Sequence, residues 1–168
     1  MPTALDVFER HHVAVFRFVR RMGLSTADAE DLTQEVFLRG VRAISAYQDR
    51  QSERAWVFRI ARNMLNDRWR AGARAPAAEP LSEGDHPGLS PPRVDGLALD
   101  EALGRLAEAE REAFLLREVG GLGYAEIAEA TGATPDAVRN RIHRARLALR
   151  QTLGPRHAAT RTAGGPEE

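Results

Sequence analysis

The chain has 168 residues, 43% apolar and only 6% aromatic, which allows one ordinary domain or two small ones with mainly aliphatic cores. It contains no cysteine, which excludes disulfides, cysteine-ligated metal sites and a thiol nucleophile. No apolar run approaches the ~20 residues of a membrane helix. Residues 1–12 lack the apolar stretch of a signal peptide, so we expect a soluble cytoplasmic protein.

The net charge is zero, but the charges are sorted along the chain, and all 24 basic residues are arginine. Residues 25–35 carry a charge of −4 and residues 50–74 carry +5. The same order recurs with −5 over 97–135 and +4 over 136–153. For any one segment, a solvated helix face explains the charge as well as a partner surface does. The repeated order of acidic and basic segments favours two kinds of partner surface.

The N-terminal block, residues 1–74, is predicted to be helical, because no run of alternating β-branched residues occurs in it. The first helix covers about Ala4–Arg21 and is ended by Gly23. A capping-box pattern, Ser25 with Asp28, starts the second helix, which runs to about Ala46. Four apolar residues are expected on the buried side of this second helix: Leu32, Val36, Val41 and Ile44.

A cluster of acidic and amide side chains opens the second predicted helix: Asp28, Glu30, Asp31, Gln34 and Glu35. The helix dipole favours acids in the first turn, which accounts for Asp28 and in part for Glu30. It explains Gln34 and Glu35 poorly, since both lie beyond that turn. No histidine or further carboxylate completes a metal site, so we expect no metal and favour an arginine-rich protein partner.

The segment 47–51 is expected to form a polar loop, after which Ser52 caps a third helix. This helix leads into a Pro-, Gly- and Ala-rich flexible linker at 75–96. The linker separates an N-terminal block, 1–74, from a C-terminal block at 97–153. The remaining tail, 154–168, has no core residues and is expected to be disordered.

The third predicted helix carries a polar stripe at helical spacing: Arg59, Arg62, Asn63, Asn66 and Arg70. Its opposite side is apolar: Val57, Ile60, Ala61, Met64 and Leu65. Arginine together with asparagine suits contacts to phosphates and to bases. The neighbouring rings of Tyr47, Trp56 and Trp69 either stack on unpaired bases or, as we favour for Trp56, lie in the core.

Four helices are expected in the C-terminal block: near 97–106, 109–119, 124–131 and 135–153. Gly132 ends the third of these as a left-handed cap, and Thr134 followed by Pro135 starts the fourth. A helix, a short glycine-containing turn and an arginine-rich helix are typical of a helix-turn-helix. A helical hairpin with a solvated arginine face is the alternative.

The last predicted helix separates an apolar stripe from a basic face. The apolar stripe consists of Val138, Ile142, Ala145 and Leu149. The candidate DNA-binding set on the other side consists of Thr134, Arg139, Asn140, His143 and Arg144. Arginine can bind two guanine acceptors and asparagine can pair with adenine in the major groove, although each side chain could instead contact a phosphate.

Three segments in this order resemble bacterial RNA polymerase sigma factors of the short extracytoplasmic-function (ECF) type: DAEDLTQEVFLRG (28–40), RAWVFRIARNMLNDRWR (54–70) and YAEIAEATGATPDAVRNRIHRARLALR (124–150). The resemblance covers about Leu5–Leu153. It implies an all-α fold in which a three-helix sigma region 2 and a four-helix sigma region 4 are joined by the flexible linker.

The resemblance implies a role for each surface. The residues implied to dock on polymerase are Glu30, Asp31, Gln34 and Glu35. Those implied to open and hold the −10 promoter element are Tyr47, Arg59, Arg62, Asn63, Asn66 and Arg70, with Asn63 at the pocket for a flipped base. Those implied to read the −35 duplex are Thr134, Arg139, Asn140, His143 and Arg144. The partners implied are core RNA polymerase, promoter DNA as duplex and melted strand, and an anti-sigma protein.

Two other classes of protein account for only part of the sequence. A stand-alone DNA-binding regulator accounts for the helix-turn-helix but leaves the acidic helix and the Asn/Arg stripe unexplained. A protein-binding helical adaptor leaves both arginine-rich faces unexplained.

One position departs from the family pattern. Many members carry glycine where Asp136 stands, and the negative charge of Asp136 repels phosphate.

Nothing in the sequence requires an enzyme or a cofactor. It has no glycine-rich phosphate loop and no Ser/His/Asp spacing that suggests a catalytic triad. His11 and His12 are adjacent and are expected to be surface residues and not ligands. The sequence therefore favours a non-enzymatic transcription initiation factor.

Overall fold

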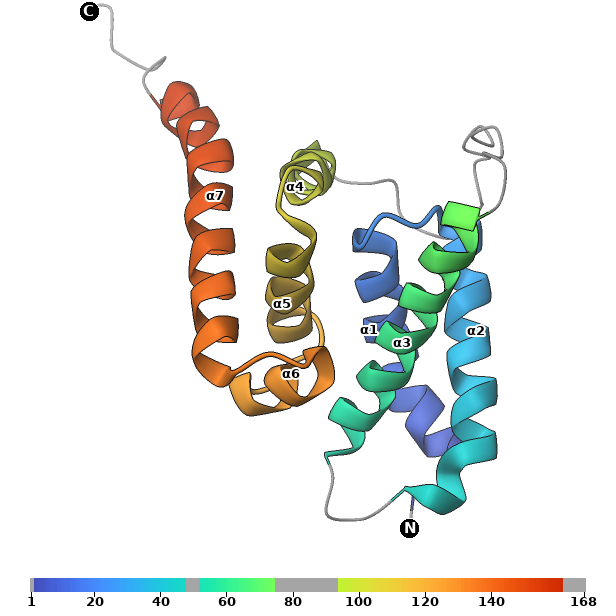
Figure 1. The fold of residues 1–168 in the computed structure, drawn as a ribbon. Helices are drawn as coiled ribbons and strands as arrows, with labels where there is room; N and C mark the ends of the chain where they lie inside the picture. Colours follow the sequence, from blue (N-terminus) through green and yellow to red (C-terminus); the bar gives the residue numbers. More distant parts are fainter. Residues whose placement is uncertain (1, 48–51, 75–93, 162–168) are drawn as a thin grey trace, which may run out of the picture.

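The computed structural model describes residues 2–47, 52–74 and 94–161. Within these ranges the chain consists of seven α-helices and one 3-10 helix, without a strand. Figure 1 shows two groups of helices side by side, one from the N-terminal part and one from the C-terminal part of the chain. The predicted all-α class is therefore confirmed. The predicted linker falls largely on 75–93, which lie outside the described residues.

The N-terminal group packs α1 (Ala4–Arg21), α2 (Thr26–Ala43) and α3 (Glu53–Arg74) around a common core. Thr3 caps α1, and its hydrogen bonds to the Asp6 carboxylate lower the pKa of that group. Buried aliphatic side chains of all three helices fill the centre. The rings of Phe18 on α1 and Phe58 on α3 meet edge to face at 5.6 Å, which fixes how these two helices pack.

The structure corrects three details of α2. The helix ends at Ala43 and the 3-10 helix Ile44–Ala46 continues it. Ser25 accepts from the backbone N–H of Asp28 as predicted, but the Asp28 carboxylate binds Arg68 Nη2 at 2.8 Å. Val41 is 51% exposed, because the buried stripe passes through Gly40, where an added Cβ atom would lie 3.7 Å from the Trp56 ring.

The C-terminal group consists of α4 (Val94–Gly104), α5 (Glu108–Glu118), α6 (Tyr124–Thr131) and α7 (Pro135–Arg161). These helices confirm the four expected from the sequence, although α4 begins inside the predicted linker. The predicted disordered tail is helical up to Arg161, because adding residues to an existing helix is far easier than nucleating one. The rest of that tail lies outside the described residues.

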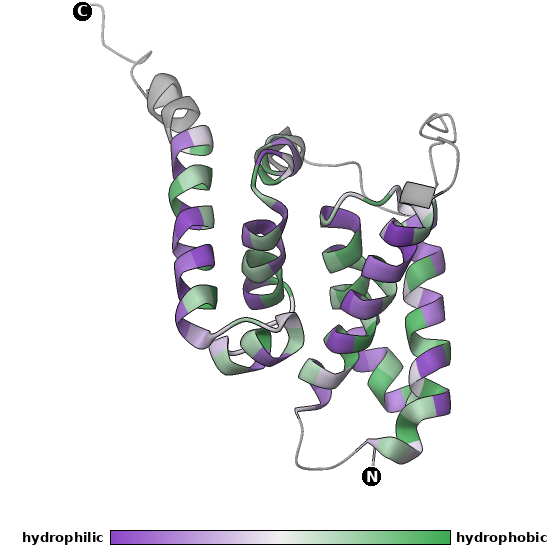
Figure 2. Cartoon of the chain, viewed as in Figure 1, coloured by the Kyte–Doolittle hydropathy of each residue, from purple (hydrophilic) through white to green (hydrophobic). Residues whose placement is uncertain are grey.

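The two groups touch along α3 and α6 and along α1 and α5. Buried apolar residues of both groups belong to one continuous cluster. Figure 2 shows hydrophilic residues along α3 and along the outer side of α7. Among the described residues, no helix combines the length and hydropathy that a membrane span requires.

Gly120, in the turn that follows α5, has no room for a side chain. A Cβ atom there would lie 2.6 Å from the Leu116 carbonyl oxygen and 2.9 Å from Leu122 Cδ1. Because one obstacle is backbone, Gly120→Ala is expected to lower the free energy of unfolding by about 1–3 kcal/mol. Urea unfolding followed by circular dichroism measures this loss.

The matched control is Gly104→Ala at the end of α4, where a Cβ atom would meet nothing within 4 Å. This variant is expected to be as stable as the unaltered chain or up to about 1 kcal/mol more stable, since alanine favours the helix. Equal unfolding curves for the two variants would contradict the steric argument.

Candidate nucleic-acid and protein interfaces

The turn between α6 and α7 is built as the sequence predicts. Gly132 ends α6 with a φ of 70°, and its N–H donates to the Ala128 carbonyl oxygen. Thr134 Oγ1 accepts from the backbone N–H of Ala137 at 3.1 Å, and Pro135 is the first residue of α7. These caps fix the angle at which α7 leaves the turn, so the predicted helix-turn-helix is confirmed.

The buried side of α7 holds it on the rest of the C-terminal group. All four residues of the predicted stripe are buried: Val138, Ile142, Ala145 and Leu149. Arg146 Nη2 also donates to Glu118 Oε1 on α5 at 2.9 Å, and this bond raises the pKa of Arg146. Arg146 therefore anchors α7, and the exposed face is defined by its other polar residues.

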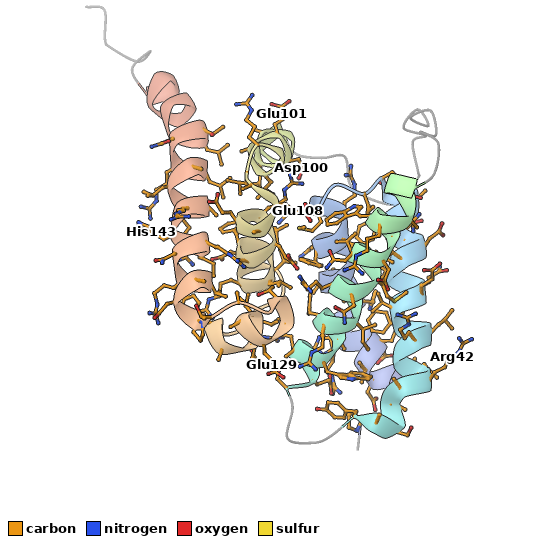
Figure 3. All side chains as sticks on the ribbon, viewed as in Figure 1. Arg42, Asp100, Glu101, Glu108, Glu129 and His143 are labelled. Carbon is orange, nitrogen blue, oxygen red and sulfur yellow. The ribbon has the colours of Figure 1, made fainter. Side chains whose placement is uncertain are left out.

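That exposed face carries the predicted DNA-binding residues of α7. Asn140, His143 and Arg144 are exposed, and Figure 3 shows His143 projecting outward from α7. Arg139 is also exposed, but its Nη1 lies 3.1 Å from Asp136 Oδ1 and its guanidinium lies over the Tyr124 ring at 5.4 Å. Asn140, His143 and Arg144 have no ion pair within the described part of the chain, so they are available to a ligand.

On α3, the predicted polar stripe is divided in two. Asn63 and Arg70 are exposed and Asn66 is half-buried at the surface. Arg59 Nη2 instead donates to Glu129 Oε1 on α6 at 2.8 Å, and Arg62 Nε donates to Glu112 Oε1 on α5. The C-terminal group thus engages both arginines at one end of the stripe and leaves the other end open.

The aromatic residues near the stripe lie in the core. Tyr47 is only 8% exposed and its ring centroid lies 5.2 Å from that of Trp56. This burial favours the core over stacking on unpaired bases for Tyr47, and the rest of the predicted loop, 48–51, lies outside the described residues. Trp56 and Trp69 are partly buried against the core, which supports the core alternative for both.

The acidic face of α2 is solvent-exposed. Its four predicted docking residues are all exposed: Glu30, Asp31, Gln34 and Glu35. No ion pair or side-chain hydrogen bond engages them within the described ranges. Leu38, one turn after Gln34, is 60% exposed and extends this face. An apolar residue on the polar side of a helix was the signal that sequence reasoning missed.

His11 is buried, which corrects the expectation that it lies on the surface. Its Nε2 lies 2.7 Å from Glu53 Oε1, and Arg10 donates to both oxygens of the same carboxylate at 3.0 and 2.9 Å. Glu53, in the first turn of α3, thereby ties that helix to α1. In the described part of the chain, no group of three or more His, Asp or Glu side chains is placed to hold a metal ion.

Comparison with known proteins identifies the two groups of helices. Residues 7–75 match the model of Sigma-70 region 2, and residues 96–149 match that of Sigma-70, region 4. The chain is 32% identical to the ECF RNA polymerase sigma factor SigE of Mycolicibacterium smegmatis over 95% of its length, but spans only 65% of SigE. It is 35% identical to the ECF sigma factor SigC of Mycobacterium tuberculosis, covering 80% of this chain and 75% of SigC.

The fold is also similar to a solved structure of CnrH, a sigma factor of Cupriavidus metallidurans, in complex with the cytosolic domain of CnrY. The TM-score is 0.69 with 27% identity, over 90% of this chain and 88% of CnrH. The matches cover both helical groups in the order that the sequence motifs predict. The chain therefore belongs to the ECF-type RNA polymerase sigma factors, the non-catalytic polymerase subunits that direct the enzyme to promoters through regions 2 and 4.

Proposed function

We propose that this chain directs core RNA polymerase to its promoters through three separate surfaces. The exposed acidic face of α2 docks on polymerase, the polar stripe of α3 holds the melted −10 strand, and the exposed face of α7 reads the −35 duplex. The observation that carries the proposal is that Asn140, His143 and Arg144 are exposed on α7, opposite a buried apolar stripe. Since it works with polymerase, we place the chain in the cytoplasm.

The α7 surface suits duplex recognition. A helix fits the major groove, where arginine and asparagine distinguish base edges, and arginine at the rim binds phosphates. Arg144 is free to turn toward either target, whereas Arg139 must first leave Asp136 and Tyr124. Thr134 already uses its hydroxyl as the α7 cap, so we assign it a contact through the position of its backbone at the start of that helix.

The α3 surface suits a melted strand. Asn63 offers an amide that both donates and accepts hydrogen bonds, as the edge of an unpaired base requires. Asn66 and Arg70 continue the surface, and Arg59 and Arg62 add two cations for phosphates once they are released from Glu129 and Glu112. We assign Tyr47 no direct contact with the melted strand, because its ring is packed against Trp56.

The α2 surface suits a basic partner. Its carboxylates and Gln34 are exposed and unengaged within the described ranges, so they can bind without breaking internal pairs. Exposed Leu38 adds an apolar contact at the same face. An anti-sigma protein is also proposed as a partner, and the support for it is the similarity to CnrH in a complex with the cytosolic domain of CnrY.

Run-off transcription tests the proposal directly. Core polymerase is incubated with this chain and with fragmented DNA of the host genome, and the 5′ ends of the transcripts are sequenced. We expect start sites that require the chain and that share two upstream elements. Transcripts that are the same with and without the chain, together with tight and specific duplex binding by the chain alone, would instead support a stand-alone regulator.

Arg144→Ala is expected to weaken binding to the −35 duplex by about 1–3 kcal/mol, or about 5–150-fold, because a free arginine that reads a base is lost. Electrophoretic mobility shift with the mapped −35 element in the polymerase complex measures this loss. Arg105→Ala is the matched control, since Arg105 is also exposed but lies between α4 and α5. Equal losses for both variants would remove Arg144 from the site.

A further inference from the structure

Asp136, in the first turn of α7, places a negative charge on the helix that is proposed to read duplex DNA. Its side chain is 89% exposed, and its Oδ1 lies 3.1 Å from Arg139 Nη1, one turn further along α7. The DNA backbone is a row of negative charges, so a carboxylate here opposes any contact with phosphate. The groups of the major groove that can donate to a carboxylate are the base amines, N4 of cytosine and N6 of adenine.

A structural role accounts for Asp136 only in small part. An acid in the first turn suits the helix dipole, but the hydroxyl of Thr134 already caps α7 by accepting from the N–H of Ala137 at 3.1 Å. The ion pair with Arg139 joins two exposed side chains one turn apart on a helix. Water and salt screen such a pair, so it contributes little to the stability of the fold.

Arg139 is held beside Asp136 by a second contact. Its guanidinium lies 5.4 Å from the centre of the Tyr124 ring, at the start of α6. Arg117 approaches the same ring at 4.9 Å, and its Nη1 donates to the Leu122 carbonyl oxygen at 3.0 Å. The ring therefore gathers two cations near the turn before α7. A donor, Arg139, and an acceptor, Asp136, stand side by side at this end of the helix.

These two side chains together match one kind of base pair. In the major groove, guanine presents two adjacent acceptors, N7 and O6, and its partner cytosine presents the donor N4 beside them. Arginine supplies two parallel donors for the guanine, and a carboxylate supplies an acceptor for the cytosine amine. In an A·T pair the donor lies between two acceptors, so the same arrangement of side chains is not matched.

We propose that Asp136 determines the specificity of −35 recognition by exchanging Arg139 for the N4 amine of a cytosine while Arg139 binds the paired guanine. The inference rests on the proposed role of α7 in reading the −35 duplex. Arg139 must leave Asp136 to reach a base, and its departure leaves a carboxylate without a partner in a groove from which water is displaced. A G·C pair offsets this loss, because it supplies a new partner for each side chain.

The exchange penalises other DNA sequences. An unpaired arginine binds any phosphate, so it adds affinity at every sequence. Arg139 gains a phosphate only by giving up Asp136, which then faces the DNA as an unpaired negative charge. A base pair without an amine at this place leaves the same charge unpaired. Discrimination therefore comes from the cost at wrong sites as well as from the contacts at the right one.

The test is a library of promoters in which the mapped −35 element carries every single base-pair change, transcribed by core polymerase with the full chain. The unaltered chain is expected to prefer G·C at one position by about 10–100-fold. Asp136→Ala is expected to reduce this preference about 5–10-fold, through higher activity on the other base pairs, and to leave the preferences at other positions unchanged. A folding defect would instead lower transcription from every template alike.

Arg139→Ala is expected to relax the preference at the same base pair, since the two side chains recognise it together. Glu101→Ala is the matched control. It also removes an exposed carboxylate from the C-terminal group, but Figure 3 shows Glu101 on α4, at the other end of this group from the turn before α7. Its base preferences are expected to equal those of the unaltered chain.

Two results would overturn the proposal: an Asp136→Ala chain that keeps every base preference, or one that relaxes a different position from Arg139→Ala. A relaxed preference in Glu101→Ala as well would show a general effect of charge and would also overturn it. In each of these cases transcription still depends on the chain, so the proposed function stands. A lack of chain-dependent transcripts from every template would count against the proposed function, and against this inference with it.

Discussion

Reversal of two charges on α2, Asp31→Arg with Glu35→Arg, is expected to weaken binding to core RNA polymerase by about 100-fold or more. The two residues are one turn apart on one exposed face, so both would meet the same partner surface. The variant loses two attractions and gains two repulsions with a basic partner. Neither carboxylate is ion-paired within the described ranges, so the fold is expected to be unchanged. Biolayer interferometry with immobilised core polymerase measures the loss.

The control reverses two other exposed acids, Glu9 on α1 and Glu101 on α4, to arginine. It changes the net charge by the same amount but leaves the acidic face of α2 intact. We expect it to bind polymerase as the unaltered chain does. If this control bound as weakly as the α2 variant, net charge and not the face of α2 would determine docking.

Local features of this fold were predictable because neighbours in the sequence determine them. The turn at 132–135 is fixed by its own residues: the left-handed Gly132, the capping hydroxyl of Thr134 and Pro135. None of these three features depends on a distant part of the chain. The spacing of Val138, Ile142, Ala145 and Leu149 defines a buried side of α7 in the same way. These local rules were sufficient to place the helix-turn-helix and the exposed basic face beside it.

Features that depend on distant partners were not predictable from the sequence. His11 is buried because Glu53, 42 residues later, approaches it, and a pair of histidines at a helix surface gives no sign of this. Arg62 is covered because Glu112, 50 residues away, lies on it. Tyr47 follows a helix end, where local polarity suggests a loop, but the α3 residue Trp56 provides a surface for its ring.

The candidate site shows the same division. Helical periodicity placed the stripe of α3 on one face, and the exposed Asn63 agrees with that placement. Periodicity describes one helix at a time, however, and cannot tell solvent from a second domain docked on the same face. The masking of Arg59 and Arg62 became visible only when both groups of helices were placed together.

Replacement of Asn63 by alanine is expected to lower the extent of promoter opening by about 10–100-fold, because the unpaired base loses an amide that both donates and accepts hydrogen bonds. Asn63 is exposed on α3, and alanine favours a helix more than asparagine does, so folding is not weakened. Permanganate footprinting of unpaired thymines in the polymerase–promoter complex measures opening. Binding to −35 duplex is expected to be unchanged, since that surface lies on α7.

Asp67→Ala is the matched control, because Asp67 is exposed one turn further along α3 and interacts only loosely with Arg70, at 3.7 Å. Its footprint is expected to equal that of the unaltered chain, and an Asn63→Ala footprint of the same intensity would remove Asn63 from the −10 site.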